Sequence, residues 1–365
     1  MKKLEGIHGL RGCGALFVVL FHLHALPKIS LPVPLNGIVE HFYLSVLLFF
    51  VLSAFTLCYS RHVAPSRYTA YMIRRFFRVA PLFYILICWQ LYRTGIPEAH
   101  VLLANVTFTF NLIPGLEPSL VWAGWAVGVE MLFYVILPAI IFVCRGPWTS
   151  ILGFVTATIC SIVLWKVFAL NPNMPQHYAY YFIGSNLSIF LAGIFAYRVF
   201  IGINKRKSRW YKLLSPIVCL VAIVAVYVDP INLHYRASGA YFAFWGMAFA
   251  LLVLWQAAFP SRIMRTKALQ WLGDRSYSIY LFHPIIIVLS LPLYSAIGHY
   301  TGLSGGYFFL ACAVWTFPIL IAVAEISYRV VEVPGIRLGR QLSRKFDKNG
   351  QVQRVEVYSG TFSPP

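Results

Sequence analysis

Long apolar stretches alternate with short polar ones along the chain, and this pattern predicts membrane-spanning helices. Each apolar stretch has about 16–25 residues, close to the roughly 20 that a helix needs to cross a bilayer. We expect spans at residues 10–26, 42–60, 77–93, 123–144, 150–170, 180–200, 212–228, 239–258, 276–297 and 307–330. The segment 100–113 is too polar and too short for an eleventh span and is expected to be a loop helix or a partly inserted segment. The pattern therefore predicts an all-α integral membrane protein with about ten transmembrane helices.

Composition supports this fold class. The chain has 365 residues, of which 59% are hydrophobic and only 11% are charged, whereas soluble domains are about 25% charged. We expect one transmembrane domain over residues 1–340 and a polar, flexible cytoplasmic tail over 341–365. The seven cysteines lie in apolar stretches without the paired spacing of a metal site, so no metal is expected. Lys2 and Lys3 precede an apolar run as in a signal peptide, but without a small-residue cleavage site we expect an uncleaved first helix.

The basic residues set the orientation of the predicted spans. With a cytoplasmic N-terminus, 25 of the 30 lysine and arginine residues lie inside; the others are Lys28, Arg93, Arg236, Arg11 and Lys166. This distribution follows the positive-inside rule and places both termini in the cytoplasm. The net charge of +19 therefore reflects membrane topology, and no nucleic-acid partner is expected.

Arg11 and His22 interrupt the first predicted span. They are eleven residues apart, about three helical turns, so both project from the same face with a rise of roughly 16 Å between them. The chosen orientation places Arg11 near the inner side and His22 near the outer side. The ordinary alternative is an arginine that reaches the inner interface and a packed histidine. Their shared face favours a functional pair.

Glu130 is the second intramembrane charge, in a predicted span that runs from outside to inside. By helical rise it lies roughly 8–12 Å from the outer boundary, which is the depth expected for His22. A carboxylate at this depth is suited to orienting the imidazole and raising its basicity, as the acidic member of a catalytic triad does. The alternative is a glutamate that fixes helix packing through backbone or hydroxyl partners.

Arg74, Arg75 and Arg78 lie at the inner end of the third predicted span. Arg75 and Arg78 have the i, i+3 spacing that places side chains on one helix surface. Guanidinium groups are well suited to binding phosphates. On spacing alone, however, the positive-inside rule explains these arginines equally well.

Two late motifs contain further polar residues. In "WLGDRSYSIYLFHPIII" (271–287), His283 is expected one to two turns inside the inner end of the ninth span, with Tyr277 and other polar residues at the helix start. The simpler interpretation is a helix start rich in capping groups and a histidine bonded to a neighbouring helix. In "YRVVEVPGIRLG", Glu332 and Pro334 are expected to form an interfacial salt bridge and a helix stop.

Together these motifs resemble the acyltransferase-3 family of bacterial inner-membrane O-acyltransferases, over about residues 4–340. The matching positions are Arg11 and His22, the phenylalanine-rich segment 46–57, Arg74, Arg75, Arg78 and Pro81, then Trp125, Glu130, Phe133, Tyr134 and Pro138, the Ser-Tyr-Ser-x-Tyr-x-x-His-Pro element that includes His283, and Glu332 with Pro334. Ala126, Met131 and Leu132 stand where the family commonly has polar residues, which leaves the acceptor preference open. We expect a stand-alone membrane domain without the lipase-like C-terminal domain of some relatives.

The resemblance implies transfer of an acyl group, usually acetyl, from cytoplasmic acyl-CoA to a hydroxyl of a cell-envelope or exported carbohydrate. It implies acyl-CoA as a co-substrate and no tightly bound cofactor. The residues that the resemblance assigns to binding of acyl-CoA are Arg74, Arg75, Arg78, Arg11, Tyr277 and His283. The residues that the resemblance assigns to binding of the carbohydrate acceptor are Trp125, Glu130 and Tyr134.

His22 is the expected catalytic base on the acceptor hydroxyl, and an acyl-histidine relay is the alternative. Glu130 would orient His22 or bind the sugar, and Arg11 would bind acyl-CoA or stabilise developing negative charge. A different class of function is a transporter or flippase for a lipid-linked sugar or small metabolite. The sequence shows no paired broken helices of the transporter kind. A membrane anchor would leave the intramembrane Arg, His and Glu unexplained.

Overall fold

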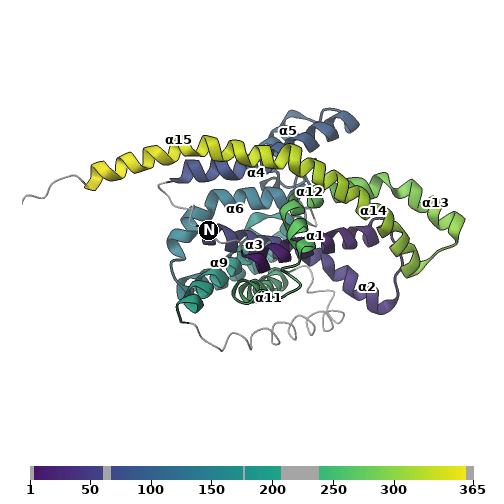
Figure 1. Cartoon of the computed structure of the whole chain (residues 1–365), viewed down its shortest axis with the longest axis horizontal. Coiled ribbons are helices and arrows are strands. Elements are labelled where there is room, and N and C mark those ends of the chain that lie inside the picture. Colours follow the sequence, from purple (N-terminus) through teal and green to yellow (C-terminus); the bar gives the residue numbers. More distant parts are fainter. Residues whose placement is uncertain (1–3, 61–66, 176, 207–237, 359–365) are drawn as a thin grey trace, which may run out of the picture.

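The computed structural model describes residues 4–60, 67–175, 177–206 and 238–358, and within these ranges every regular element is a helix (Figure 1). The elements are α1 (Glu5–Ala25), α2 (Val33–Glu40), η1 (His41–Leu44), α3 (Ser45–Tyr59), α4 (Tyr68–Thr94), α5 (Ala99–Val106), η3 (Phe110–Leu112), α6 (Gly124–Val143), α7 (Pro147–Leu170), α8 (Tyr178–Tyr181), α9 (Ile183–Arg206), α11 (Gly239–Ala258), α12 (Lys267–Leu289), α13 (Leu291–Thr301), α14 (Gly305–Ser327), the π-helix η7 (Tyr328–Glu332) and α15 (Val333–Tyr358). The predicted all-α class is confirmed.

The predicted spans coincide with long helices wherever the structure describes them. In the described ranges, seven helical segments are long and apolar enough to cross a bilayer, or eight if the bent pair α12 and α13 counts as one span. The predicted span 212–228 lies outside the described residues. The predicted span 276–297 covers parts of α12 and α13, between which the chain bends by 53°. Segment 100–113 forms the short helices α5 and η3.

Helices α1 and α12 pack side by side and run in the same direction. His8 contacts Asp274 near the start of both helices, and His22 contacts His283 toward their ends. Gly12 lies directly against the carbonyl of Leu269, with no room for a Cβ atom between the two backbones. Such close backbone approach through glycine is typical of helix pairs within membranes.

Helix ends that the charge pattern assigns to the cytoplasmic side lie together. Arg11 near the start of α1 reaches Thr56 near the end of α3. Arg198 of α9 donates to the Cys144 carbonyl at the end of α6. Gly6 of α1 packs against the end of α11. The packing therefore agrees with the predicted alternation of the chain across the bilayer.

The C-terminal region continues as a helix through the last motif. Helix α14 leads through the π-helix η7 into α15, which runs alongside α4 (Figure 1). The predicted helix stop at Pro334 is therefore wrong, and the predicted domain boundary at residue 340 falls inside α15. Glu332 is buried and accepts hydrogen bonds from the backbone N–H and hydroxyl of Ser278, so the predicted interfacial salt bridge is also wrong.

Candidate functional site

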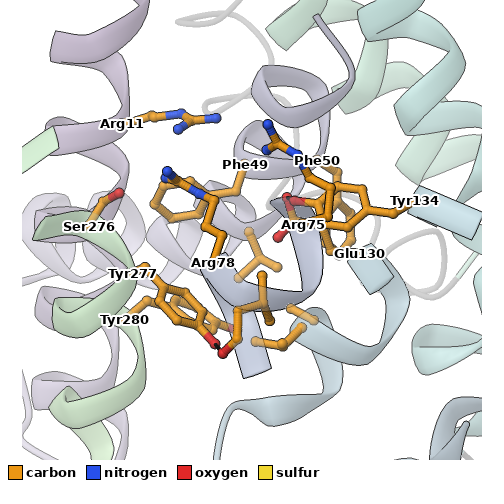
Figure 2. Close-up of a pocket in the computed structure, with 14 residues that line it drawn as sticks. Arg11, Phe49, Phe50, Arg75, Arg78, Glu130, Tyr134, Ser276, Tyr277 and Tyr280 are labelled. Carbon is orange, nitrogen blue, oxygen red and sulfur yellow. Dashed lines mark hydrogen bonds between the residues drawn. The ribbon is translucent and has the colours of Figure 1, made fainter. Parts of the chain in front are cut away.

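A polar pocket lies between α1, α3, α4, α6 and α12. Its charged and polar lining residues are Arg11, Arg75, Arg78, Glu130, Tyr134, Ser276, Tyr277 and Tyr280. Figure 2 shows the three guanidinium groups gathered at one end of the pocket, with Glu130 and Tyr134 on the side opposite Ser276. Two of these five helices, α1 with Arg11 and α4 with Arg75 and Arg78, thus bring three cations to one place. Such a concentration of guanidinium groups is suited to a polyanionic ligand.

Arg11 is held in this pocket by the inner end of α3. Its Nη2 atom donates to the hydroxyl of Thr56 at 3.1 Å. Thr56 in turn donates to the carbonyl of Leu52, one helical turn earlier, at 2.7 Å. The guanidinium therefore has a fixed partner inside the helix bundle, and its remaining donors are available to the pocket.

The three arginines of α4 divide between two surfaces. Arg75 and Arg78 line the pocket, as their i, i+3 spacing predicts. The guanidinium carbon of Arg75 lies 5.8 Å from the ring centroid of Tyr134. Arg74 instead donates to the hydroxyl of Ser343 on α15, at 3.1 Å. The predicted group of three is therefore split, and only two members face the site.

Glu130 belongs to this arginine pocket. Its Oε1 atom accepts hydrogen bonds from the hydroxyls of Ser53 and Tyr134, the latter at 2.5 Å. Ser53 is one turn from the Thr56 that holds Arg11, so Glu130 lies at the level of Arg11 rather than of His22. The expectation that Glu130 orients His22 is wrong. The depth estimate failed because Gly124, the first residue of α6, is itself buried, beneath the loop that precedes it.

His22 contacts His283 at a second polar position. The Nδ1 atom of His22 lies 3.2 Å from the Nε2 atom of His283, and their ring centroids are 4.8 Å apart. His283 is fully buried. Its expected place near the inner end of a span is wrong, because α12 begins at Lys267 and carries His283 more than four turns along the helix.

Tyr280 connects the arginine pocket with the histidine pair, and Phe49 packs against it in the pocket. Tyr280 and Phe49 both line the pocket, with ring centroids 6.1 Å apart. Tyr280 lies one turn before His283, and these two ring centroids are 5.7 Å apart. The hydroxyl of Tyr280 donates to the carbonyl of Ala123 at 3.0 Å, immediately before α6. The two polar positions are therefore about one helical turn apart along α12.

The remaining predicted site residues have distinct surroundings. Tyr277 lines the pocket, and its hydroxyl donates to the carbonyl of Val79 at 2.8 Å. Tyr134 lies in the pocket beside Glu130. Trp125 lies outside the set of lining residues and packs among aromatic rings, with the centroid of Tyr180 at 5.0 Å and that of Phe50 at 6.0 Å.

Sequence reasoning missed Ser53 and Thr56, the two α3 side chains that hold Glu130 and Arg11. Both lie in the second half of α3, among apolar residues, at i, i+3 spacing, so they share a face of the helix. That pair of hydroxyls is the available sequence signal. An apolar span that carries two polar groups on one face presents that face to other polar groups.

The helices and the buried polar site define a multi-pass membrane protein. Residues 4–325 match the acyltransferase-3 family, described as an acyltransferase domain, and the chain belongs to this family. Its resemblance to that family, expected from the motifs, is confirmed.

Two curated relatives are similar to this chain over most of its length. The peptidoglycan O-acetyltransferase OatA of Listeria monocytogenes serovar 1/2a is 22% identical over 373 residues, covering 91% of this chain and 56% of the relative. YrhL of Bacillus subtilis strain 168, provisionally named a peptidoglycan O-acetyltransferase, is 22% identical over 398 residues, covering 99% of this chain and 58% of the relative. The chain thus spans less than three fifths of each relative's length. No solved structure matches it significantly.

Proposed function

We propose that the protein is a membrane O-acyltransferase that moves an acetyl group from cytoplasmic acetyl-CoA to a hydroxyl of a carbohydrate. The observation that carries this proposal is the short distance between the arginine pocket and the histidine pair. Three arginines line the pocket, and the histidine pair lies about one turn of α12 beyond it. Membership of the acyltransferase-3 family supports the reaction class. The names of the two relatives make a peptidoglycan sugar the first acceptor to test.

The arginine pocket is the proposed binding site for the donor. Coenzyme A carries several phosphate charges, and Arg11, Arg75 and Arg78 supply guanidinium forks that bind such groups. With the phosphates there, the thioester extends toward Tyr280 and the histidine pair. Glu130, fixed by Ser53 and Tyr134, balances part of the positive charge when the pocket is empty.

His22 is the proposed general base. Its neutral imidazole takes the proton of the acceptor hydroxyl while the hydroxyl oxygen attacks the thioester carbonyl carbon. The new C–O bond forms, the C–S bond breaks, and the departing coenzyme A thiolate receives the proton from His22. The products are the acetyl ester and free coenzyme A, and the base returns to its neutral form.

The test uses the purified chain in lipid vesicles, with radiolabelled acetyl-CoA and a soluble peptidoglycan oligosaccharide. We expect labelled acetyl ester on the sugar, and loss of this product in His22→Ala with acetyl-CoA binding retained. Removing a general base lowers the rate by about 10²–10⁴-fold. Transfer at the parent rate by His22→Ala would refute the assignment of the base. Transport of unmodified sugar without consumption of acetyl-CoA would refute the reaction and favour a transporter.

A further inference from the structure

The two histidines have a hydrogen-bond pattern that restricts their protonation. His22 Nδ1 lies 3.0 Å from the carbonyl oxygen of Val18, as well as 3.2 Å from His283 Nε2. His283 Nδ1 lies 3.3 Å from the carbonyl oxygen of Ile279. Each ring therefore points its Nδ1 atom at the carbonyl one turn earlier in its own helix. A carbonyl oxygen only accepts hydrogen bonds.

This pattern assigns one tautomer to each ring. A nitrogen that faces a carbonyl oxygen at hydrogen-bond distance carries the proton, so Nδ1 is protonated in both His22 and His283. A neutral imidazole has one N–H, so both Nε2 atoms are left with a lone pair. His283 Nε2 then accepts the Nδ1–H of His22, which it shares with Val18. The opposite tautomers would turn each Nδ1 lone pair toward a carbonyl oxygen.

We propose that His283 is a positioning residue that holds His22 in the Nδ1-protonated tautomer and so presents Nε2 as the basic atom. This inference rests on the proposed function, in which His22 is the general base. His283 then fills the place expected for Glu130, with a neutral acceptor in place of a carboxylate. Its full burial and its bond to Ile279 fix the position of the accepting atom.

The contact with His283 also stabilises His22 in the protonated form that it has after taking the hydroxyl proton. When His22 Nε2 takes the hydroxyl proton, the Nδ1–H becomes a donor on a cation, and its hydrogen bond to His283 Nε2 becomes charge-assisted and stronger. The proton remains on His22 Nε2 until the thiolate of coenzyme A takes it. His283 keeps its own proton on Nδ1, toward Ile279, throughout the cycle.

Two amide variants separate this role from simple packing. In His283→Gln the amide oxygen reaches the place of Nε2 and still accepts from His22. In His283→Asn the amide occupies the place of Nδ1, so it keeps the bond to Ile279 but has no atom that reaches His22. We expect His283→Asn to lose about 10²-fold or more in kcat, because the base is no longer held in one tautomer. His283→Gln should stay within about tenfold of the parent kcat, and neither should change KM for acetyl-CoA.

A spectroscopic measurement tests the tautomer without requiring activity. Solid-state NMR of the ¹⁵N-histidine-labelled chain, with His22 signals identified by their loss in His22→Gln, reports which ring nitrogen carries the proton. We expect protonated Nδ1 in the parent and His283→Gln, and a mixture of tautomers in His283→Asn. Equal kcat in the two amide variants, or protonated Nε2 on His22 in the parent, would overturn the proposal. If the parent has no transferase activity, the proposed function fails, and the spectra alone decide the role of His283.

Discussion

Replacing Gly12 with alanine tests whether the close contact between α1 and α12 sets the geometry of the histidine pair. A Cβ atom at residue 12 would lie 2.5 Å from the carbonyl oxygen of Leu269. Ordinary van der Waals contact begins at 3.4 Å. Because both contacting groups are on rigid helix backbone, the helices have to separate locally by about 0.9 Å.

A separation of this size is enough to break the hydrogen bond between the two histidines. If the same displacement reaches the histidines, the 3.2 Å contact between His22 and His283 becomes roughly 4 Å, beyond hydrogen-bond range. Misplacement of a reacting group by about 1 Å can lower a rate by about 10²-fold. Overpacking of this kind also costs about 1–3 kcal/mol of stability. We therefore expect Gly12→Ala to lose most transferase activity and to unfold at a lower temperature.

The measurements are the rate of acetyl transfer in vesicles and thermal unfolding in detergent. Gly273→Ala gives an independent version from the opposite helix, since its Cβ would lie 2.3 Å from the His8 carbonyl oxygen. Gly202→Ala is the matched control, because that position is exposed on α9 and, among the described residues, only neighbouring parts of its own helix lie within 4 Å of the added Cβ. Parent-like activity and stability in both Gly12→Ala and Gly273→Ala would refute the reasoning.

Two further substitutions test other parts of the structure. Arg75→Ala should raise KM for acetyl-CoA about tenfold or more through the loss of a charge-assisted hydrogen bond. Arg74→Ala should change this KM less than about threefold, because the Arg74 side chain reaches Ser343 instead of the pocket. Equal effects of the two substitutions would contradict the assignment of Arg75 to the pocket and of Arg74 to another surface. Glu332→Ala should lower stability by about 1–3 kcal/mol, because the buried N–H and hydroxyl of Ser278 lose their acceptor. An unchanged unfolding temperature for Glu332→Ala would show that this contact contributes nothing.

Much of the helical architecture is predictable from the sequence, because a bilayer imposes one length and one polarity on every span. The same constraint identifies Arg11, His22 and Glu130 as unusual, since ionisable groups are costly in hydrocarbon. The i, i+3 spacing of Arg75 and Arg78 correctly places them on one surface. These features depend on local sequence alone.

Depth and partners are less predictable, because they depend on where helices begin and how they pack. Lys267 begins α12 well before the apolar stretch, which displaces His283 from its expected level. The loop before α6 buries Gly124 and moves Glu130 to the level of Arg11. The hydrogen bond between Ser53 and Glu130 joins two residues that are 77 positions apart in the chain. No periodicity within either helix specifies that pairing.

The position of the Phe49 and Tyr280 rings has a consequence for the electrical insulation of the membrane. Both rings line the cationic pocket, Tyr280 also contacts His283 of the histidine pair, and the Tyr280 hydroxyl is occupied by the Ala123 carbonyl. In the proposed reaction a neutral acyl group passes these rings at little cost, whereas an ion would have to shed its water there, which is strongly unfavourable. Under the proposed function, acyl transfer across the bilayer would then leave its ion gradients intact.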